Sequence, residues 1–174
     1  MVTSTVRSGP CSGASEGDGV TNRGVPGFDP ARLRQLRKQR ALLPSQLADL
    51  AGLSRSAISQ YEAAVVVPNA DSLATLARAL RVSPLELVVA DEIGHGLLGL
   101  RIAAGLTQAE VMERLSAHAY GDAFSLSRYK SLERGKVRRL TNADAEALAG
   151  VFSVAPESVR AAHLWDLGGA AGAR

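Results

Sequence analysis

Residues 47–62 read LADLAGLSRSAISQYE, and this stretch predicts two short helices joined by a tight turn. Leu47 and Ala51 stand at helical spacing and give the first helix an apolar face. Gly52 follows where that helix must stop, because glycine tolerates the left-handed backbone that ends many helices. The hydroxyl of Ser54 can then cap the free amides of the second helix.

The second helix of this stretch has an inward apolar face and an outward polar face. Helical spacing turns Ala57, Ile58 and Tyr61 inward and places Arg55, Ser56, Ser59 and Gln60 outward. A polar face with short side chains and a single charge can lie in the DNA major groove and offer hydrogen bonds to base edges. Arg55 is the best candidate for a guanine contact and Gln60 for an adenine contact.

The composition of the 174-residue chain suits one domain or two small helical ones. Hydrophobic residues make up 46% of the chain but aromatic residues only 4%. The formal net charge of +3 falls within residues 28–90, and the segments on either side are neutral. This balance allows an anionic partner without requiring one.

Cysteine usage and hydropathy indicate a soluble cytoplasmic protein. Cys11 is the only cysteine, so the sequence offers no intramolecular disulfide and no cysteine-based metal site. No apolar run approaches the roughly 20 residues that span a bilayer, and the N-terminus lacks an apolar signal core. We expect no membrane segment and no cofactor.

The start of the chain differs from the rest. Residues 1–27 are rich in Gly, Pro, Ser and Thr without an apolar period, and we expect a disordered segment. A first helix should begin after the N-cap Asp29 and the N1 proline Pro30. Further helices are expected to begin at Pro44 and just after Ser54, and to cover about residues 70–80 and 84–90, with a loop at 65–69.

The pattern of residues 28–92 recurs in residues 93–167. Leu97, Leu100 and Arg101 stand 64 residues after Leu33, Leu36 and Arg37. The offset becomes 71 for Ser125, Tyr129 and Glu133, which match Ser54, Ile58 and Glu62, and 72 for Leu148, Val154 and Pro156, which match Leu76, Val82 and Pro84. We interpret the pattern as two copies of one five-helix unit, with a seven-residue insertion around residues 116–122 and a disordered tail at 168–174.

Each copy resembles the phage-repressor-like helix-turn-helix domain of the Cro/repressor or XRE family. The first copy carries the match at Leu36-Arg37, Leu47-Ala48, Gly52-Leu53-Ser54, Ile58-Ser59 and Tyr61-Glu62, and the second at Leu100-Arg101, Gly105-Leu106-Thr107-Gln108 and Glu133-Arg134-Gly135. The resemblance implies an all-α fold of two tandem five-helix bundles that binds double-stranded DNA and usually regulates transcription. It also implies two buried ion pairs, Arg37–Glu62 and Arg101–Glu133.

The two copies differ at the start of their second helix. Family members usually have Thr-Gln there, in which Thr caps the helix and Gln binds a phosphate. The second copy keeps Thr107-Gln108 and forms a capping box with Glu110, whereas the first copy has Leu43-Pro44. The resemblance therefore assigns a phosphate contact to Gln108 but to no residue at the equivalent place in the first copy.

The second reading helix would present Leu126, Ser127, Lys130 and Ser131 outward. The insertion before it leaves its angle to the preceding helix open. The basic residues Arg134, Lys136, Arg138 and Arg139 follow in a loop, where we expect phosphate contacts, with a merely solvated loop as the alternative.

Several other motifs carry less weight. Gly94 to Gly99 fits the GxGxxG pattern, but a helix of the repeat follows it instead of a βαβ unit, and no nucleotide site is expected. His95, His118 and His163 are far apart and should lie at the surface or at helix ends. Trp165 should pack on the first helix of its own copy, with a dimer contact as the alternative. No constellation indicates an enzyme.

The sequence thus predicts a sequence-specific double-stranded DNA-binding transcriptional regulator. The candidate DNA-binding residues are Arg55, Ser56, Ser59, Gln60, Gln108, Ser127, Lys130, Ser131, Lys136 and Arg138. The alternative is a helix-turn-helix scaffold that acts as a protein-interaction module, such as an antitoxin or a sigma-factor partner. A homodimer, and a second unit specialised for dimerisation or phosphate clamping, are left open.

Overall fold

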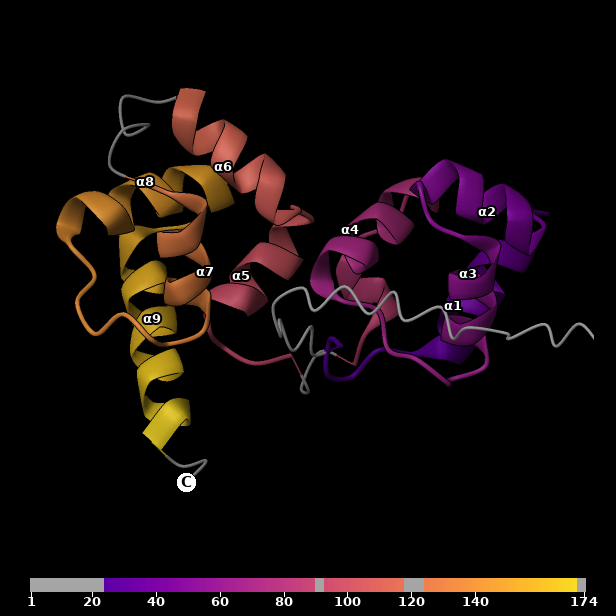
Figure 1. Cartoon of the computed structure of the whole chain (residues 1–174), viewed down its shortest axis with the longest axis horizontal. Coiled ribbons are helices and arrows are strands. Elements are labelled where there is room, and N and C mark those ends of the chain that lie inside the picture. The colour runs from indigo at the N-terminus through magenta and orange to yellow at the C-terminus, as the bar shows by residue number, and fades with distance from the viewer. Residues whose placement is uncertain (1–23, 90–92, 118–123, 172–174) are drawn as a thin grey trace, which may run out of the picture.

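The computed structural model describes residues 24–89, 93–117 and 124–171, and these ranges are helical apart from connecting loops. The all-α prediction is confirmed for them (Figure 1). The elements are α1 (Pro30–Gln39), α2 (Pro44–Ala51), α3 (Arg55–Glu62), α4 (Ala70–Ala79), the 3-10 helix η1 (Pro84–Leu87), α5 (Leu97–Ala104), α6 (Gln108–Ala117), α7 (Leu126–Glu133), α8 (Asn142–Phe152) and α9 (Pro156–Ala171). Within the described ranges, no helix is long and apolar enough to cross a membrane.

The helices gather around two hydrophobic cores, one in α1–α4 with η1 and one in α5–α9 (Figure 1). We call these groups the first and the second unit. Leu33, Leu47 and Leu76 are fully buried in the first core. The second core holds buried residues from all five of its helices, including Leu97, Val111, Tyr129, Leu148 and Val159. Helix α5 serves both cores, because its Ile102 packs into the first one.

The helix ends of the first unit form as the sequence predicts. Asp29 accepts a hydrogen bond from the backbone N–H of Arg32 at 2.9 Å and caps α1. Gly52 ends α2 in the left-handed conformation, with φ of 65°. The hydroxyl of Ser54 accepts a bond from the N–H of Ala57 at 3.1 Å and caps α3. These caps fix the turn between α2 and α3.

The prediction of a helix over residues 84–90 is wrong. Only one 3-10 turn forms, and the backbone becomes extended at Val88, which forms an isolated antiparallel bridge with Phe28. The N–H of Val89 donates to the carbonyl of Gly27 at 2.7 Å, and the N–H of Asp29 donates to that of Leu87 at 2.9 Å. These long-range bonds replace the next helical turn, and residue 90 lies outside the described residues.

The prediction of disorder is wrong for the described parts of both terminal segments, residues 24–27 and 168–171. Val25 is buried in the first core, and its N–H donates to the carbonyl of Pro68 at 2.9 Å. Helix α9 continues to Ala171, past the expected start of a frayed tail at Gly168. The predicted insertion falls largely on residues 118–123, which include His118 and lie outside the described residues.

Left-handed backbone recurs at three pairs of equivalent helix ends. The pairs are Ala41 and Gly105, Ala64 and Gly135, and Arg81 and Ser153, which stand 64, 71 and 72 residues apart. Positive φ is uncommon for residues other than glycine, so its recurrence at the offsets of the sequence pattern is informative. The same backbone turns therefore follow α1 and α5, α3 and α7, and α4 and α8.

Candidate nucleic-acid interface

Helix α3 packs on the first core with its inward face and exposes its outward face to solvent. Ile58 and Tyr61 are buried in the first core and anchor the helix. The four outward residues, Arg55, Ser56, Ser59 and Gln60, are all exposed. Within the described part of the chain, none of their side chains forms a hydrogen bond or an ion pair. Their donors and acceptors are available to a ligand.

An ion pair fixes the far end of α3 to α1. Arg37 Nε lies 2.5 Å from Glu62 Oε1, and its Nη2 donates to Oε2 at 2.9 Å. Nη1 of the same arginine donates to the carbonyl of Leu42 at 2.7 Å, which ties in the turn before α2. The hydrogen bond to Glu62 raises the pKa of Arg37 despite the opposing effect of burial. The pair implied by the resemblance is present and positions the outward face of α3.

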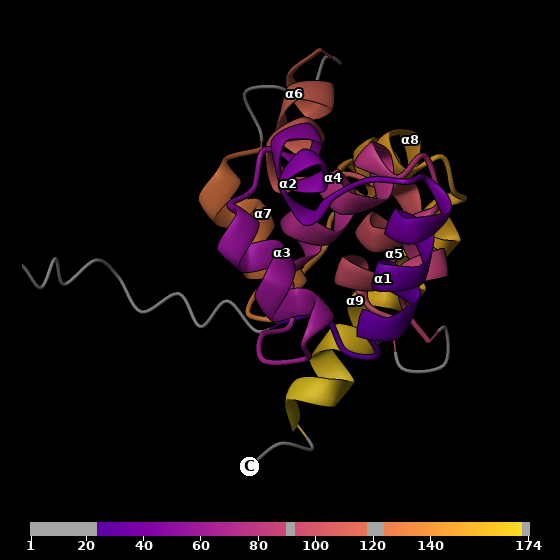
Figure 2. The ribbon, with the colours of Figure 1, turned by 90° about the vertical axis from the view of Figure 1, so that its right-hand side faces the viewer.

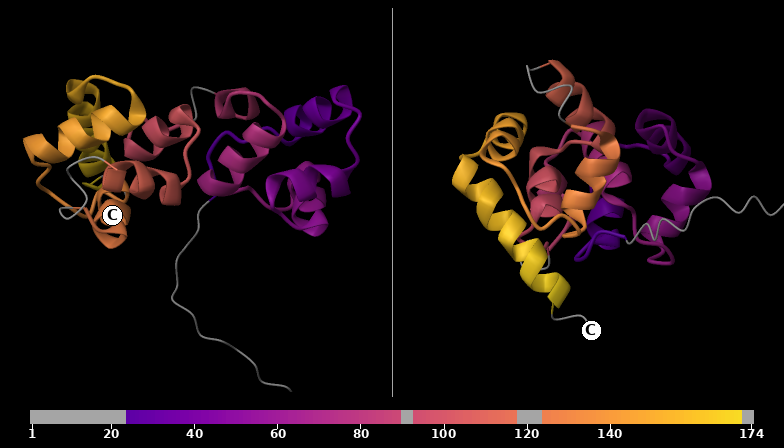
Figure 3. Two further views of the ribbon diagram at one scale, coloured as in Figure 1. Left: turned by 90° about the horizontal axis from the view of Figure 1, so that it is seen from above. Right: turned by 60° about the vertical axis from the view of Figure 1, so that its left-hand side comes forward.

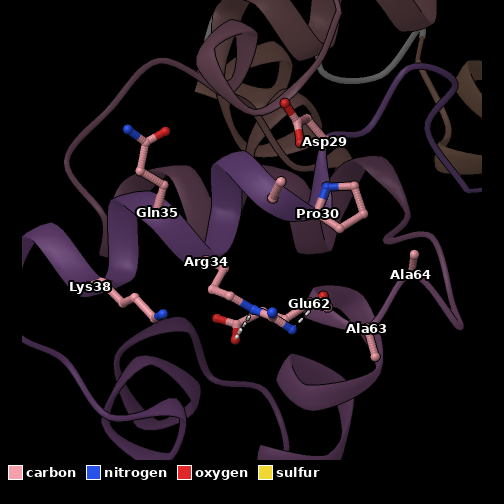
Figure 4. A pocket seen from close by; sticks show the side chains of 9 residues that line it. Asp29, Pro30, Arg34, Gln35, Lys38, Glu62, Ala63 and Ala64 are labelled. Atoms are coloured by element: carbon pink, nitrogen blue, oxygen red, sulfur yellow. Dashed lines mark hydrogen bonds and ion pairs between the residues drawn. The ribbon is translucent and has the colours of Figure 1, made fainter.

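A groove of about 680 Å³ lies between α1 and the end of α3 (Figure 4). Arg34 reaches across it and donates to the carbonyl of Glu62 at 3.0 Å, and Lys38 lies on the same flank. The Glu62 carboxylate of this groove already binds Arg37. The groove therefore places the cations of Arg34 and Lys38 beside α3.

The second ion pair is also present and has more partners. Arg101 Nε lies 2.6 Å from Glu133 Oε1, and its Nη1 lies 2.6 Å from Asp71 Oδ1 in the first unit. The hydroxyl of Tyr129 donates to Glu133 Oε1 at 2.6 Å. Burial, with the charge of Glu133, raises the pKa of Tyr129 well above its ordinary value. Sequence reasoning missed both additional contacts, although Tyr129 stands in register with Ile58 of the first copy.

The geometry around Gln108 is at odds with the expected phosphate contact. Its side-chain amide donates to Glu133 Oε2 at 2.7 Å, and its backbone N–H donates to Asp71 Oδ1 at 3.1 Å. The capping box of Thr107 and Glu110 does form, with bonds of 2.8 and 3.2 Å. The amino end of α6 is therefore well capped but already has a carboxylate beside it.

Helix α7 presents fewer free polar groups than α3. Ser125 caps it, but Leu126 is apolar and 41% exposed. Lys130 and Ser131 are half-buried, and the Ser131 hydroxyl donates to the carbonyl of Ser127 at 2.8 Å. Both α3 and α7 lie on the same side of the molecule (Figures 2 and 3).

Exposed cations follow α7. Arg134, Lys136, Arg138 and Arg139 are all exposed, and we call them the basic segment. In the ranges that the structure describes, no hydrogen bond or ion pair of their side chains is present. Their position directly after α7 is compatible with the expected phosphate contacts.

Two glycines of the GxGxxG pattern, Gly96 and Gly99, are required by packing. A Cβ on Gly96 would lie 1.8 Å from Asp166 Oδ1, and one on Gly99 would lie 2.1 Å from the carbonyl oxygen of Gly94. Asp166 Oδ2 accepts a bond from the N–H of Leu97 at 2.9 Å, so a side chain of α9 caps α5. Burial raises the pKa of Asp166, although the bond from Leu97 opposes the shift. No local sequence signal points to this long-range cap, because its two partners stand far apart in the chain.

The predictions for the positions of two aromatic side chains, His163 and Trp165, are wrong. His163 is buried instead of lying at the surface, and neither ring nitrogen has a hydrogen-bond partner among the described residues. Trp165 is 55% exposed, and its ring meets the edge of His95 at 4.8 Å between centroids instead of entering the core. No group of His, Cys, Asp and Glu suited to a metal ion occurs in the parts of the chain that the structure describes.

One comparison with known proteins finds a match within the first unit. Residues 33–87 match a protein-family model described as helix-turn-helix, which covers most of α1 through η1. No curated protein and no solved structure matches the chain. The match concerns this segment alone and shows that residues 33–87 are similar to helix-turn-helix domains.

Proposed function

We propose that the chain is a sequence-specific regulator of transcription that inserts α3 into the major groove of double-stranded DNA. The observation that supports this most directly is the outward face of α3, which is exposed, polar and without partners in the described residues. A helix entering the major groove needs such a face, because each base pair there has its own pattern of donors and acceptors.

The side chains of that face have distinct roles in the proposal. Arg55, in the first turn of α3, donates two hydrogen bonds to the O6 and N7 of a guanine. Gln60 both donates and accepts and suits an adenine. Ser56 and Ser59 are short, let the helix approach closely, and bond a base edge or a phosphate.

The second unit is, in this proposal, a second copy of the first. The recurring left-handed residues and the second Arg–Glu pair support a common origin. Its contribution to DNA binding comes from Ser127 and Lys130 on α7 and from the basic segment, including Lys136 and Arg138. Because Ser131 bonds its own helix and Gln108 bonds Glu133, we assign them no leading role.

Selection of bound duplexes from a random DNA pool tests this function. We expect one enriched motif for the full-length chain, and we expect log K for that duplex to fall with log salt at about −0.9 per phosphate contact. The variant Arg160→Ala removes a half-buried arginine of α9 that pairs with Glu157, serves as a charge control and should select the same motif. If no sequence is enriched and no salt-dependent binding to DNA is measured, the proposal is contradicted and the protein-interaction module is favoured.

A further inference from the structure

We infer that the two units are joined head to tail, so that the chain contacts DNA asymmetrically. In this arrangement α3 contacts the bases. The basic segment contacts the phosphates on only one side of the bases that α3 contacts. This inference rests on the proposed function and adds the polarity of the bound site. It depends on how α4 of the first unit meets α5 and α6 of the second.

The joint between the units combines ion pairs and hydrogen bonds with apolar packing. Asp71 at the start of α4 bonds Arg101 of α5 and the backbone N–H of Gln108 at the start of α6. Arg78 at the end of α4 lies 2.7 Å from Glu110 Oε1 of α6, and its Nη2 donates to the carbonyl of Gly105 at 3.4 Å. These bonds along one helix, together with Ile102 in the first core, fix one relative orientation.

This joint does not relate the units by a two-fold axis. By the offsets of the repeat, the counterpart of α4 is α8, and the counterparts of α5 and α6 are α1 and α2. A two-fold pair would join the same surface of both units, whereas here α4 meets α5. The residues that stand 72 positions after Asp71 and Arg78 are Ala143 and Gly150. Helix α8 therefore lacks a charge at both equivalent positions and cannot repeat these two contacts.

The same joint covers the amino end of α6. A helix amino terminus attracts anions, because its first N–H groups are unpaired and the helix dipole is positive there. The Asp71 carboxylate already occupies this position and would repel a phosphate. Among the described residues, the free cations at α7 and directly after it are Lys130 and those of the basic segment. Since α3 and α7 share one side, this segment meets the duplex on one flank of the α3 site (Figures 2 and 3).

Duplexes extended on one side of the selected motif test this inference. Wild-type protein should gain affinity when DNA is added on one side and gain nothing on the other. The triple variant Lys136→Ala, Arg138→Ala, Arg139→Ala should not show that gain, and its salt slope should be smaller by about 0.9 for each phosphate that it no longer binds. Its base preference should stay, because α3 is unchanged. Equal gains on both sides for wild type, or an unchanged salt slope for the variant, would overturn the inference.

A second variant tests the joint itself. Asp71→Asn combined with Arg78→Gln removes the charges of α4 that face the second unit, and we expect the preference for one flank to disappear while the selected motif stays the same. Asp49→Asn on α2, an exposed aspartate, is the matched control and should keep the flank preference. A double variant that retains the full preference would refute the role of the joint. Absence of any selected motif in wild type would contradict the proposed function instead.

Discussion

At the scale of single residues, a few buried polar groups determine where α3 points. Glu62 is the last residue of α3, and its side chain is only 7% exposed. It holds Arg37 of α1 through two hydrogen bonds. This pair could be predicted from the sequence through the family resemblance, whereas the contacts of Tyr129 and Asp71 with the second pair could not, because they depend on the packing of distant helices.

Glu62→Gln should destabilise the protein strongly. The substitution leaves the guanidinium of Arg37 buried without its counter-charge, which typically costs about 3–5 kcal/mol. Urea unfolding followed by circular dichroism measures the decrease in stability. Glu157→Gln, whose carboxylate is exposed and faces Arg160, is the control and should cost less than about 1 kcal/mol. Equal costs for the two variants would mean that the buried pair does not hold α3.

Gly96→Ala should destabilise the junction of α5 and α9. The new Cβ would overlap the carboxylate of Asp166, which caps α5, and overpacking of this kind costs about 1–3 kcal/mol. Gly94→Ala is the matched control, because nothing lies within 4 Å of its Cβ position. Thermal melting of the two variants should show a lower Tm for Gly96→Ala alone, and two equal melting curves would contradict this packing.

At the scale of elements, local signals predict helix starts better than they predict long-range contacts. The caps Asp29 and Ser54 and the corner at Gly52 are short-range features, and each is visible in the sequence. The cap at Ser83 and Pro84 predicts a longer helix than η1, but the backbone of residues 87–89 pairs with that of residues 27–29 instead. The exposed position of Trp165 has a similar origin, since helical spacing alone does not show where α9 extends beyond its neighbours.

Leu43→Ser should stabilise α2. Leu43 stands at the N-cap and provides no side-chain acceptor. Because it is 62% exposed, its replacement by serine removes little buried apolar surface. Gln46 already accepts a bond from the N–H of Leu43 at 2.8 Å, and a serine would complete a capping box. We expect a gain of about 1 kcal/mol in the free energy of unfolding. An unchanged or lower value in urea unfolding would show that the helix start is already satisfied.

At the scale of the whole molecule, we expect the joint between the units to weaken in acid. Burial alone raises the pKa of Glu110, but hydrogen bonds from the N–H of Thr107 and from Arg78 outweigh it, and the pKa falls below its ordinary 4.5. A carboxylate with a lowered pKa stabilises the fold at pH values above 4.5, and that stability is lost as the pH falls through the folded-state pKa.

The free energy of unfolding should therefore decrease as the pH is lowered from 4.5, and Glu110→Gln should weaken this dependence. The glutamine keeps the capping box but lacks the charge that faces Arg78. Glu113→Gln, on an exposed residue of the same helix, is the control and should leave the pH profile as in wild type. Two variants with identical pH profiles would argue against a charged contact between α4 and α6.

The proposed repeat can be inferred from offsets in the sequence, but the contacts between the two units cannot. Offsets of 64, 71 and 72 match the places where the left-handed helix ends recur. The charges of Asp71 and Arg78 have no counterpart in the second copy, so no periodic signal marks them as contacts between the units. The expected role of Gln108 depends on a free amino end of α6, which the joint covers.

The most direct measurement of base reading by α3 is the affinity of wild type and Arg55→Ala for every single-base variant of the selected duplex. Wild type should discriminate at consecutive base pairs. Arg55→Ala should bind the best duplex more weakly by about 1–3 kcal/mol and become indifferent at one guanine position, while keeping the other preferences. An Arg55→Ala profile identical to that of wild type would contradict a base-reading role for the outward face of α3.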